Sequence, residues 1–253
     1  MSEIRHLPAA PTQQTVYESG AVIDRHRHDD HQLIYVSTGV LAIRTARGDW
    51  VASRDRAVWV PAHTWHEHRF YGRTLFHTIG FAVGEPSWAA SPAVIGAHGL
   101  LRELIVACTE PDLPPAESAR LRAVIGDRLH RAAVHGLVLP TARDPRLADA
   151  CRLVEHDLSR PCSLPWLARR VGTSERTLTR LFRTEFGTTY PQWRTAVRVF
   201  RAMVSLAEGA TVTEAGHACG WATTSAFVDT FARTMGQTPG AYRSAATALP
   251  PHH

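Results

Sequence analysis

"LTRLFRTEFGTT", residues 178–189, is followed 49 positions later by a related stretch, "FVDTFARTMGQT", residues 227–238. The two stretches have apolar residues at positions 178/227 and 182/231, and both have glycine at position 187/236. In each copy, an upstream helical segment ends at Gly172 or Gly220, and a polar turn then leads to a second helix that opens with Ser or Thr as its N-cap. The spacing therefore predicts a helix-turn-helix motif, present twice.

The second helix of each predicted motif has a packing side and a polar side. In the first copy, one helical stripe is apolar and consists of Leu178, Leu181, Phe182 and Phe186. The other stripe is polar and consists of Arg176, Thr179, Arg180 and Arg183. A solvated charged face explains one such helix equally well. Two such helices in tandem are more typical of a pair of DNA-recognition helices, because arginine and small polar side chains read base edges in the major groove.

A helix predicted over about residues 191–207 lies between the two motifs. At ~1.5 Å per residue it forms a rod of ~25 Å, which is comparable with the ~34 Å that separates successive major-groove faces. The second recognition helix offers Thr224, Ser225, Val228 and Asp229, with no arginine before Arg233. We therefore expect a bipartite DNA reader in which the first repeat dominates sequence discrimination.

The distribution of charge supports an anionic partner for the C-terminal part of the chain. Residues 1–140 contain 14 arginines and 14 acidic residues, whereas residues 141–253 contain 14 arginines and 9 acidic residues. The net charge of +5 therefore lies in the C-terminal part. Double-stranded promoter DNA is the partner that this balance and the repeat together predict.

The N-terminal part has the pattern of a small antiparallel β-barrel. From about residue 14 to 83, short segments rich in β-branched and aromatic residues alternate with turn residues such as Gly39, Gly48 and Pro61. Two helical segments follow, over residues 99–110 and 116–133, and form a hairpin. This hairpin either packs on its own barrel or joins two subunits, and one face of each helix could do both. We expect no strand after residue 146.

These elements predict an α+β chain with two domains. Residues 1–138 form a small antiparallel β-barrel with the helical hairpin, residues 139–146 form a linker, and residues 147–253 form an all-α domain of two helix-turn-helix motifs joined by a long helix. No apolar run approaches the ~20 residues needed to span a bilayer, and the N-terminus lacks a secretory pattern, so we expect a cytoplasmic protein without a membrane partner. The cysteines, which contain no C-x-x-C pair, are expected to be reduced thiols that fill space; they are Cys108, Cys151, Cys162 and Cys219.

"GWATTSAFVDTFARTMGQTPGAYR", residues 220–243, resembles the C-terminal signature of AraC/XylS-type transcriptional regulators. The span from about residue 147 to 243 is similar to their paired helix-turn-helix domain. The resemblance implies a sequence-specific DNA-binding transcriptional regulator that contacts bases from the early turns of both recognition helices. Asp229 stands where arginine often occurs, although a carboxylate can accept a hydrogen bond from cytosine N4. The candidate DNA-contacting residues are Arg176, Thr179, Arg180 and Arg183 in the first helix, and Thr224, Ser225, Asp229 and Arg233 in the second.

A histidine-rich stretch, "RHRHDDHQL" at residues 25–33, marks the predicted barrel. Side chains of a strand alternate between faces, so His26 and His28 project to one side, and Gln32 joins them if the strand continues without a bulge. His66 and His68 share a parity in the same way, just after a segment bounded by Pro61. Two strands can thus bring imidazoles together inside one barrel.

The spacing of these residues resembles the two motifs of cupin barrels. The first motif is matched by Gly20, His26, His28, Gln32 and Gly39, with glutamine where glutamate is usual, and the second by Pro61, His63 and His66. The resemblance implies that residues 1–138 form a cupin-like domain for effector or metal sensing and dimerisation. It also implies the metal ligands His26, His28, Gln32 and His66, with His68 as a possible additional ligand. Three imidazoles and an amide oxygen suit divalent Zn, Ni, Co, Cu or Fe. The loss of an anionic ligand should weaken binding, as suits a reversible sensor.

Other interpretations of the histidines remain open. They could line a metal-free pocket, form hydrogen bonds to a carboxylate or sugar effector and titrate near neutral pH. They could also lie on the surface without a function. His31, His63 and His77 are expected to be structural. The favoured function is a homodimeric transcriptional regulator that senses a metal or a small-molecule effector, with no catalytic residues. The alternative is a metal-dependent cupin enzyme, an oxygenase or isomerase, with a helical appendage, which the helix-turn-helix repeat disfavours.

Overall fold

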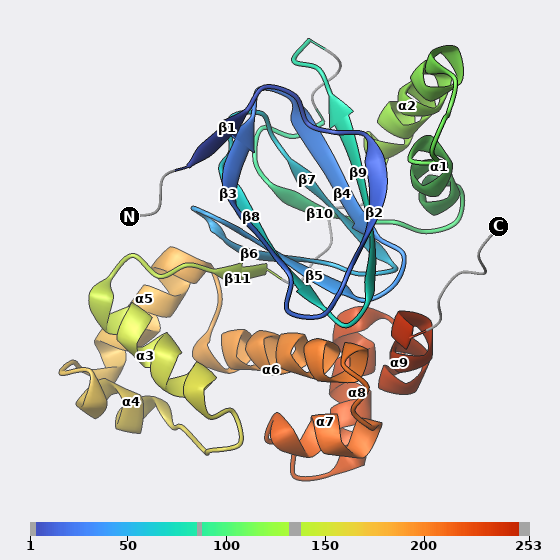
Figure 1. Cartoon of the computed structure of the whole chain (residues 1–253). Coiled ribbons are helices and arrows are strands. Elements are labelled where there is room, and N and C mark those ends of the chain that lie inside the picture. Colours follow the sequence, from blue (N-terminus) through green and yellow to red (C-terminus); the bar gives the residue numbers. More distant parts are fainter. Residues whose placement is uncertain (1–3, 85–87, 132–137, 248–253) are drawn as a thin grey trace. The chain divides into compact units, whose positions relative to one another are not determined.

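The computed structural model describes residues 4–84, 88–131 and 138–247, which divide into two compact units (Figure 1). Among these residues, the first unit comprises 4–46, 50–84, 88–131 and 244–247, and the second comprises 47–49 and 138–243. Each unit is considered by itself. A short strand, β11 (Val138–Pro140), occupies the point where the sequence predicts the start of a linker. The predicted domain boundaries otherwise remain a prediction.

The first unit is built on two facing sheets of mainly antiparallel strands. Within this unit one sheet has the order β1-β3-β8-β5-β6, and the other, called the five-stranded sheet below, has the order β10-β7-β4-β9-β2. One pair departs from the antiparallel pattern, because β1 pairs in parallel with β3. The strands are β1 (Arg5–Leu7), β2 (Gln13–Tyr17), β3 (Val22–His28), β4 (His31–Val36), β5 (Val40–Thr45), β6 (Gly48–Ala52), β7 (Arg56–Val60), β8 (His66–Tyr71), β9 (Thr74–Phe81) and β10 (Ala93–Gly96).

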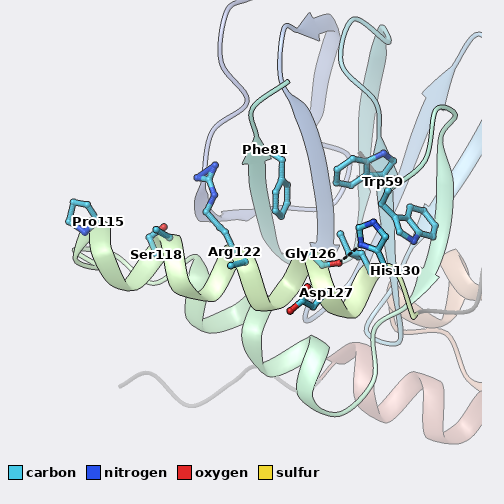
Figure 2. Close-up of a pocket in the computed structure, with 12 residues that line it drawn as sticks. Trp59, Phe81, Pro115, Ser118, Arg122, Gly126, Asp127 and His130 are labelled. Atoms are coloured by element: carbon cyan, nitrogen blue, oxygen red, sulfur yellow. Dashed lines mark hydrogen bonds between the residues drawn. The ribbon is translucent and has the colours of Figure 1, made fainter. Parts of the chain in front are cut away.

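The central strands of the five-stranded sheet, β7, β4 and β9, are buried along nearly their whole length, which fits a sheet covered on both faces. One face packs against the predicted helical hairpin, formed by α1 (Leu100–Cys108) and α2 (Pro115–Leu129). Leu33, Trp59 and Ile79 share a core cluster with Ile105 and Leu129 of the hairpin. The intervening residues of the same strands, which have the opposite parity, point to the other face. The hairpin therefore packs on its own barrel, and a cavity of about 540 Å³ remains under α2 (Figure 2).

The second unit is helical, and the predicted tandem repeat is present in it. Its helices are α3 (Pro145–His156), α4 (Leu164–Arg170), α5 (Glu175–Phe186), α6 (Tyr190–Ala207), α7 (Val212–Ala218), α8 (Thr224–Met235) and α9 (Pro239–Thr247), the last belonging to this unit up to residue 243. The first motif is α4–α5 and the second is α7–α8. The predicted fold class is confirmed, including the long helix α6 between the two motifs.

Equivalent residues of the two repeats cap the recognition helices, end them and fill their cores. Ser174 and Thr223 cap α5 and α8, accepting hydrogen bonds from the backbone N–H groups of residues 177 and 226. Both helices end at a left-handed glycine, with φ of 67° at position 187 and 76° at position 236. Phe182 and Phe231 are fully buried. The sequence repeat is therefore a repeat of caps and core residues, and this fixes the exposed faces of both recognition helices.

The four cysteines are buried and unpaired, as the absence of a C-x-x-C pair predicts. Burial raises the pKa of the Cys219 thiol to about 11, so this thiol is protonated at neutral pH. None of the helices found in residues 4–84, 88–131 and 138–247 is long and apolar enough to cross a membrane.

Candidate functional site

The first recognition helix, α5, presents four predicted DNA-contacting side chains to solvent. Arg176 lies in its first turn and Thr179 and Arg180 in its second, and these residues and Arg183 are all exposed. The opposite face is buried through Leu178, Leu181 and Phe182. The helix therefore holds its polar face outward, with arginines at the end that reaches base edges in a helix-turn-helix.

The second recognition helix, α8, presents a different surface. Ser225, Asp229 and Arg233 are exposed, and Thr224 is half-buried. The Asp229 carboxylate and the Arg233 guanidinium form an ion pair across one helical turn, with Nη2 and Oδ2 3.0 Å apart. Because this pair is internal to α8, it supports the expectation that the first repeat dominates base discrimination. The assignment of these side chains to DNA contacts remains a prediction.

A basic cluster at α4, the first helix of the first motif, is not evident from the sequence pattern. The guanidinium groups of Arg160 and Arg170 lie over the half-buried ring of Trp166, 4.7 and 5.7 Å from its centroid. Arg169, also in α4, is exposed. Arginines next to a recognition helix are suited to phosphate contacts, which position a protein on DNA without reading sequence. The only sequence signal was the aromatic residue inside "SLPWLARR".

Three buried histidines converge between β3 and β8 of the barrel. In the pairing of these strands His26 lies opposite His66, and Ile23 opposite His68, with a register shift between residues 23 and 26. One potential ligand atom from each of His26, His66 and His68 lies within 4.8 Å of the others. The ring centroids are 4.2 Å apart for His26–His66, 5.1 Å for His66–His68 and 5.4 Å for His26–His68. The two strands thus bring imidazoles together as the parity of the sequence predicts.

Backbone hydrogen bonds leave ring nitrogens of this cluster available. The Nδ1 atom of His26 donates to the carbonyl of Asp24 at 2.7 Å, and Nδ1 of His66 donates to the carbonyl of Thr64 at 2.9 Å. A carbonyl oxygen only accepts, so in both rings Nδ1 carries the hydrogen and Nε2 has the lone pair. Within the described chain, Nε2 of His66 and both ring nitrogens of His68 are buried without a hydrogen-bond partner. In folded proteins the large majority of buried polar side-chain atoms have a hydrogen-bond partner, a water or a bound ligand included.

The same burial keeps these histidines uncharged. Desolvation, reinforced by the neighbouring His26, lowers the pKa of His66 to about 3. Burial lowers the pKa of His68 well below its usual value of 6.5, and it also lowers the pKa of His26. Neutral imidazoles are the form that binds metal ions. The cluster is therefore poised to ligate at neutral pH.

The other predicted ligands lie close to this cluster or on the facing sheet. The buried ring of His28 lies 5.0 Å from that of His26 and 5.5 Å from that of His66, centroid to centroid. Gln32 belongs to β4, and its amide nitrogen donates to Oγ1 of Thr78 at 2.7 Å, which leaves its Oε1 without a partner among the described residues. The tightest grouping is thus His26, His66 and His68. The ligand set expected from the sequence remains a prediction.

The remaining barrel histidines have partners that fit structural roles. Nδ1 of His31 accepts a hydrogen bond from the backbone N–H of Ala62 at 3.0 Å, and its ring stacks on Trp59. Nδ1 of His63 lies 3.4 Å from Oδ1 of the Asp29 carboxylate. His77 lies inside the first unit, within 2.9 Å of the Ser37 hydroxyl and 2.7 Å of the Thr109 hydroxyl.

The buried His77 makes stability depend on pH. Burial lowers its pKa to about 4, below the 6.5 of an exposed histidine, so between these values the unfolded chain binds the extra proton. The stability that neutral His77 contributes is complete above pH ~6.5 and decreases as the pH falls towards ~4, by about 2–3 kcal/mol. In urea titrations with a chelator present, the difference in unfolding free energy between the wild type and His77→Gln should shrink over this interval. His156→Gln, at an exposed position, should follow the wild type at every pH. Parallel curves for the wild type and His77→Gln would show that His77 does not titrate as its environment indicates.

Comparisons with known proteins match both units. Residues 13–79 match the cupin domain family, and residues 167–245 match the helix-turn-helix domain family. The HTH-type transcriptional regulator NimR of Escherichia coli K12 is 28% identical over 232 residues, which cover 89% of this chain and 84% of NimR. The regulatory protein Ada of Salmonella typhimurium is 34% identical over 98 residues, which cover 39% of this chain and 27% of Ada.

Among solved structures, a transcriptional regulator with an AraC-type DNA-binding domain from Chromobacterium violaceum is 29% identical to this chain. The match covers 42% of this chain and 96% of that one, with a TM-score of 0.40. The two matched domain families correspond to the strand-rich unit that carries the histidine cluster and to the helical unit that carries the tandem repeat.

Proposed function

Since this chain is an AraC-type DNA-binding transcriptional regulator with a cupin domain, we propose that its barrel binds a divalent transition metal that controls promoter binding. The observation that carries the proposal is the convergence of His26, His66 and His68, whose potential ligand atoms lie within 4.8 Å of one another. Their low pKa values and unpartnered ring nitrogens fit a cation better than an anionic or neutral effector.

The donor set limits which metal fits. Three neutral imidazoles suit divalent Zn, Ni, Co, Cu or Fe, and they supply no negative charge to hold a harder ion such as magnesium. His28 and Oε1 of Gln32 are the candidate additional donors, the first beside the cluster and the second on the facing sheet. When bound, the metal would supply a positively charged centre with a position open to an exogenous ligand. This chemistry suits a reversible sensor.

The DNA side of the proposal relies on the two recognition helices. We assign base contacts to the exposed early turns of α5 and α8, with Arg176 and Arg180 as the main readers. The proposal includes a homodimer, so that two chains read two half-sites of a promoter. A metal changes promoter binding only if its affinity differs between the DNA-competent state and the other states of the protein.

Metal content and DNA affinity, measured on the same full-length protein, test this proposal. Chain purified without an affinity tag, stripped with a chelator and reloaded with one metal at a time, should retain about one ion per chain by elemental analysis. His66→Ala, and the double variant His26→Ala with His28→Ala, should lose it, whereas the exposed control His156→Ala should retain it. The stripped and loaded wild type should differ about fivefold or more in affinity for promoter DNA.

Each alternative outcome points to a different function. If the wild type retains none of the five metals, the metal site is wrong and a metal-free effector pocket becomes the better interpretation. If metal binds but DNA affinity does not change, the metal is structural and not an effector. Substrate turnover by the loaded protein would revive the cupin enzyme.

A further inference from the structure

Two half-buried arginines one turn apart on α6, Arg194 and Arg198, donate hydrogen bonds to backbone carbonyls on either side of that helix in the sequence. The carbonyls that Arg194 contacts lie in the loop before the first helix-turn-helix motif, and the carbonyl that Arg198 contacts lies in the second motif. We propose that this pair, the arginine clamp, fixes the recognition helices relative to each other and so sets the spacing of the two DNA subsites that one chain accepts. The inference rests on the reading of DNA by both α5 and α8 proposed above.

Arg198 holds the turn of the second motif. Its Nε atom donates to the carbonyl oxygen of Cys219, the C-cap of α7, at 2.5 Å. Its guanidinium carbon lies 3.9 Å from the centroid of the Trp221 ring, and that ring lies 4.9 Å from the ring of Phe227 in α8. Phe227 is fully buried. Because these groups are packed one on the next, the position of the second recognition helix depends on the Arg198 side chain.

Arg194 holds the loop before the first motif. Its Nη2 atom donates to the carbonyl oxygen of Leu158 at 3.3 Å and to that of Arg160 at 2.6 Å. The loop between α3 and α4 that contains these carbonyls has a defined shape, because the Asp157 carboxylate accepts hydrogen bonds from the backbone N–H groups of Ser159 and Arg160. Arg194 therefore ties a shaped segment, and with it the start of α4, to the long helix.

The loop before the first motif also touches the turn of the second motif directly. A Cβ atom at Gly220 would lie 2.4 Å from the carbonyl oxygen of Leu158, so the close approach requires glycine. The same carbonyl oxygen accepts the hydrogen bond from Arg194. Three segments, the long helix, the loop before α4 and the turn before α8, therefore meet at one carbonyl group. A change in the angle between the motifs would disturb contacts of all three.

The clamp holds two positive charges close together. Burial, and then the neighbouring charge of Arg194, lowers the pKa of Arg198 below its ordinary value. Like charges four positions apart destabilise a helix. A guanidinium group is suited to such a position because it is weakly hydrated, stacks on an aromatic ring and donates hydrogen bonds in a fixed plane. These two arginines therefore act on the protein backbone, unlike the exposed arginines of α5.

A fixed pair of recognition helices accepts one spacing on DNA. Successive base pairs are ~3.4 Å apart along the axis and are rotated by ~34–36°, because about 10–10.5 of them make one turn of ~34–36 Å. One base pair inserted between the two subsites therefore moves the second subsite away and turns it around the duplex. A locked protein then loses the contacts of one helix, whereas a loosened protein can follow both subsites.

Anisotropy titration of the full-length protein tests the clamp, with duplexes that contain one half-site recovered by binding selection. The spacing ratio is the affinity for the selected duplex divided by the affinity for the same duplex with one base pair inserted between the subsites. It should be about tenfold or more for the wild type, because the contacts of one helix are lost. It should fall to about threefold or less in Arg198→Met, which retains an unbranched side chain and removes the donors. Arg201→Met removes the same charge from an exposed position on α6 and should keep the wild-type ratio.

The spacing ratio separates positioning from stability. If Arg198→Met only lowers the folded fraction, both affinities fall by the same factor and the ratio stays at the wild-type value, which overturns the proposal. A wild type that binds both spacings equally overturns it as well. Scrambling each subsite alone identifies the cause of a failure. If the second subsite can be scrambled without loss, reading by α8 is wrong and the clamp has no spacing to set, whereas a loss there combined with an unchanged ratio in Arg198→Met refutes the clamp alone.

Discussion

Replacing Arg176 and Arg180 together by alanine is expected to weaken binding of the full-length protein to its promoter DNA by about 10²- to 10⁴-fold. Both side chains are exposed on the early turns of α5, opposite the buried Leu178 and Phe182. A well-formed arginine contact with a guanine edge discriminates against the wrong base by about 1–3 kcal/mol, and two such contacts add if they are separate. Fluorescence anisotropy at fixed salt, on specific and scrambled DNA, measures the loss.

A matched variant separates base reading from general electrostatics. Arg152→Ala combined with Arg201→Ala removes the same charge from exposed positions on α3 and α6 of the same unit. It should reduce specific and non-specific binding alike, and only through the salt-dependent component. Equal losses for the two double variants, with no change in the preference for specific DNA, would mean that α5 does not read bases.

Gly220→Ala is expected to destabilise the second helix-turn-helix unit by about 2–5 kcal/mol. Gly220 has a φ of 82°, a left-handed conformation that costs an alanine roughly 1–2 kcal/mol. A Cβ atom there would also lie 2.4 Å from the carbonyl oxygen of Leu158 and 2.9 Å from Cα of Ser159, and both of these atoms belong to the backbone. The chain must therefore shift, and the turn between α7 and α8 shifts with it. Urea unfolding followed by circular dichroism gives the change in free energy.

The first repeat offers the control for this substitution. Gly172 occupies the corresponding turn between α4 and α5 with a similar φ of 67°, but no atom outside its chain neighbours lies within 4 Å of a Cβ built there. Gly172→Ala should therefore cost only the backbone strain, about 1–2 kcal/mol. If both variants lose the same stability, the close approach to Leu158 contributes nothing.

The tandem repeat was predictable because its signals are local. Ser174 and Thr223 as caps, and Gly187 and Gly236 as helix ends, act through the backbone next to them, so spacing alone placed both recognition helices. The exposed faces followed from helical periodicity. The ion pair between Asp229 and Arg233 could also have been predicted from the sequence, because the two residues are four positions apart on one helix. In this pair both side chains contact each other within the second recognition helix.

The histidine cluster was predictable only in part. Alternation along strands predicted that His26 and His28 share one face, that His66 and His68 share one face, and that the two strands can bring imidazoles together. Which histidines come closest depends on the register between β3 and β8. The irregularity between residues 23 and 26 sets this register, and no turn residue in the sequence marks it. It brings His68 into the closest group, where the sequence suggested only an additional ligand.

Features that depend on packing between distant segments were not predictable. The strand β11 is only three residues long, and "VLPTARDPR" reads as a linker by composition. The cavity under α2 needs Trp59 and Phe81 from two strands and Arg122 from a helix, and their meeting follows from how the hairpin lies on the sheet. Local propensity contains no information about such a meeting.

Hydroxyl-radical footprinting of the full-length protein on a promoter fragment recovered by binding selection tests the central claim, that the duplicated motif reads DNA at two places. The account predicts two protected patches for each half-site, on the same face of the duplex and about 10–10.5 base pairs apart, with the stronger protection under the first repeat. One patch per half-site, or two patches on opposite faces, would contradict it.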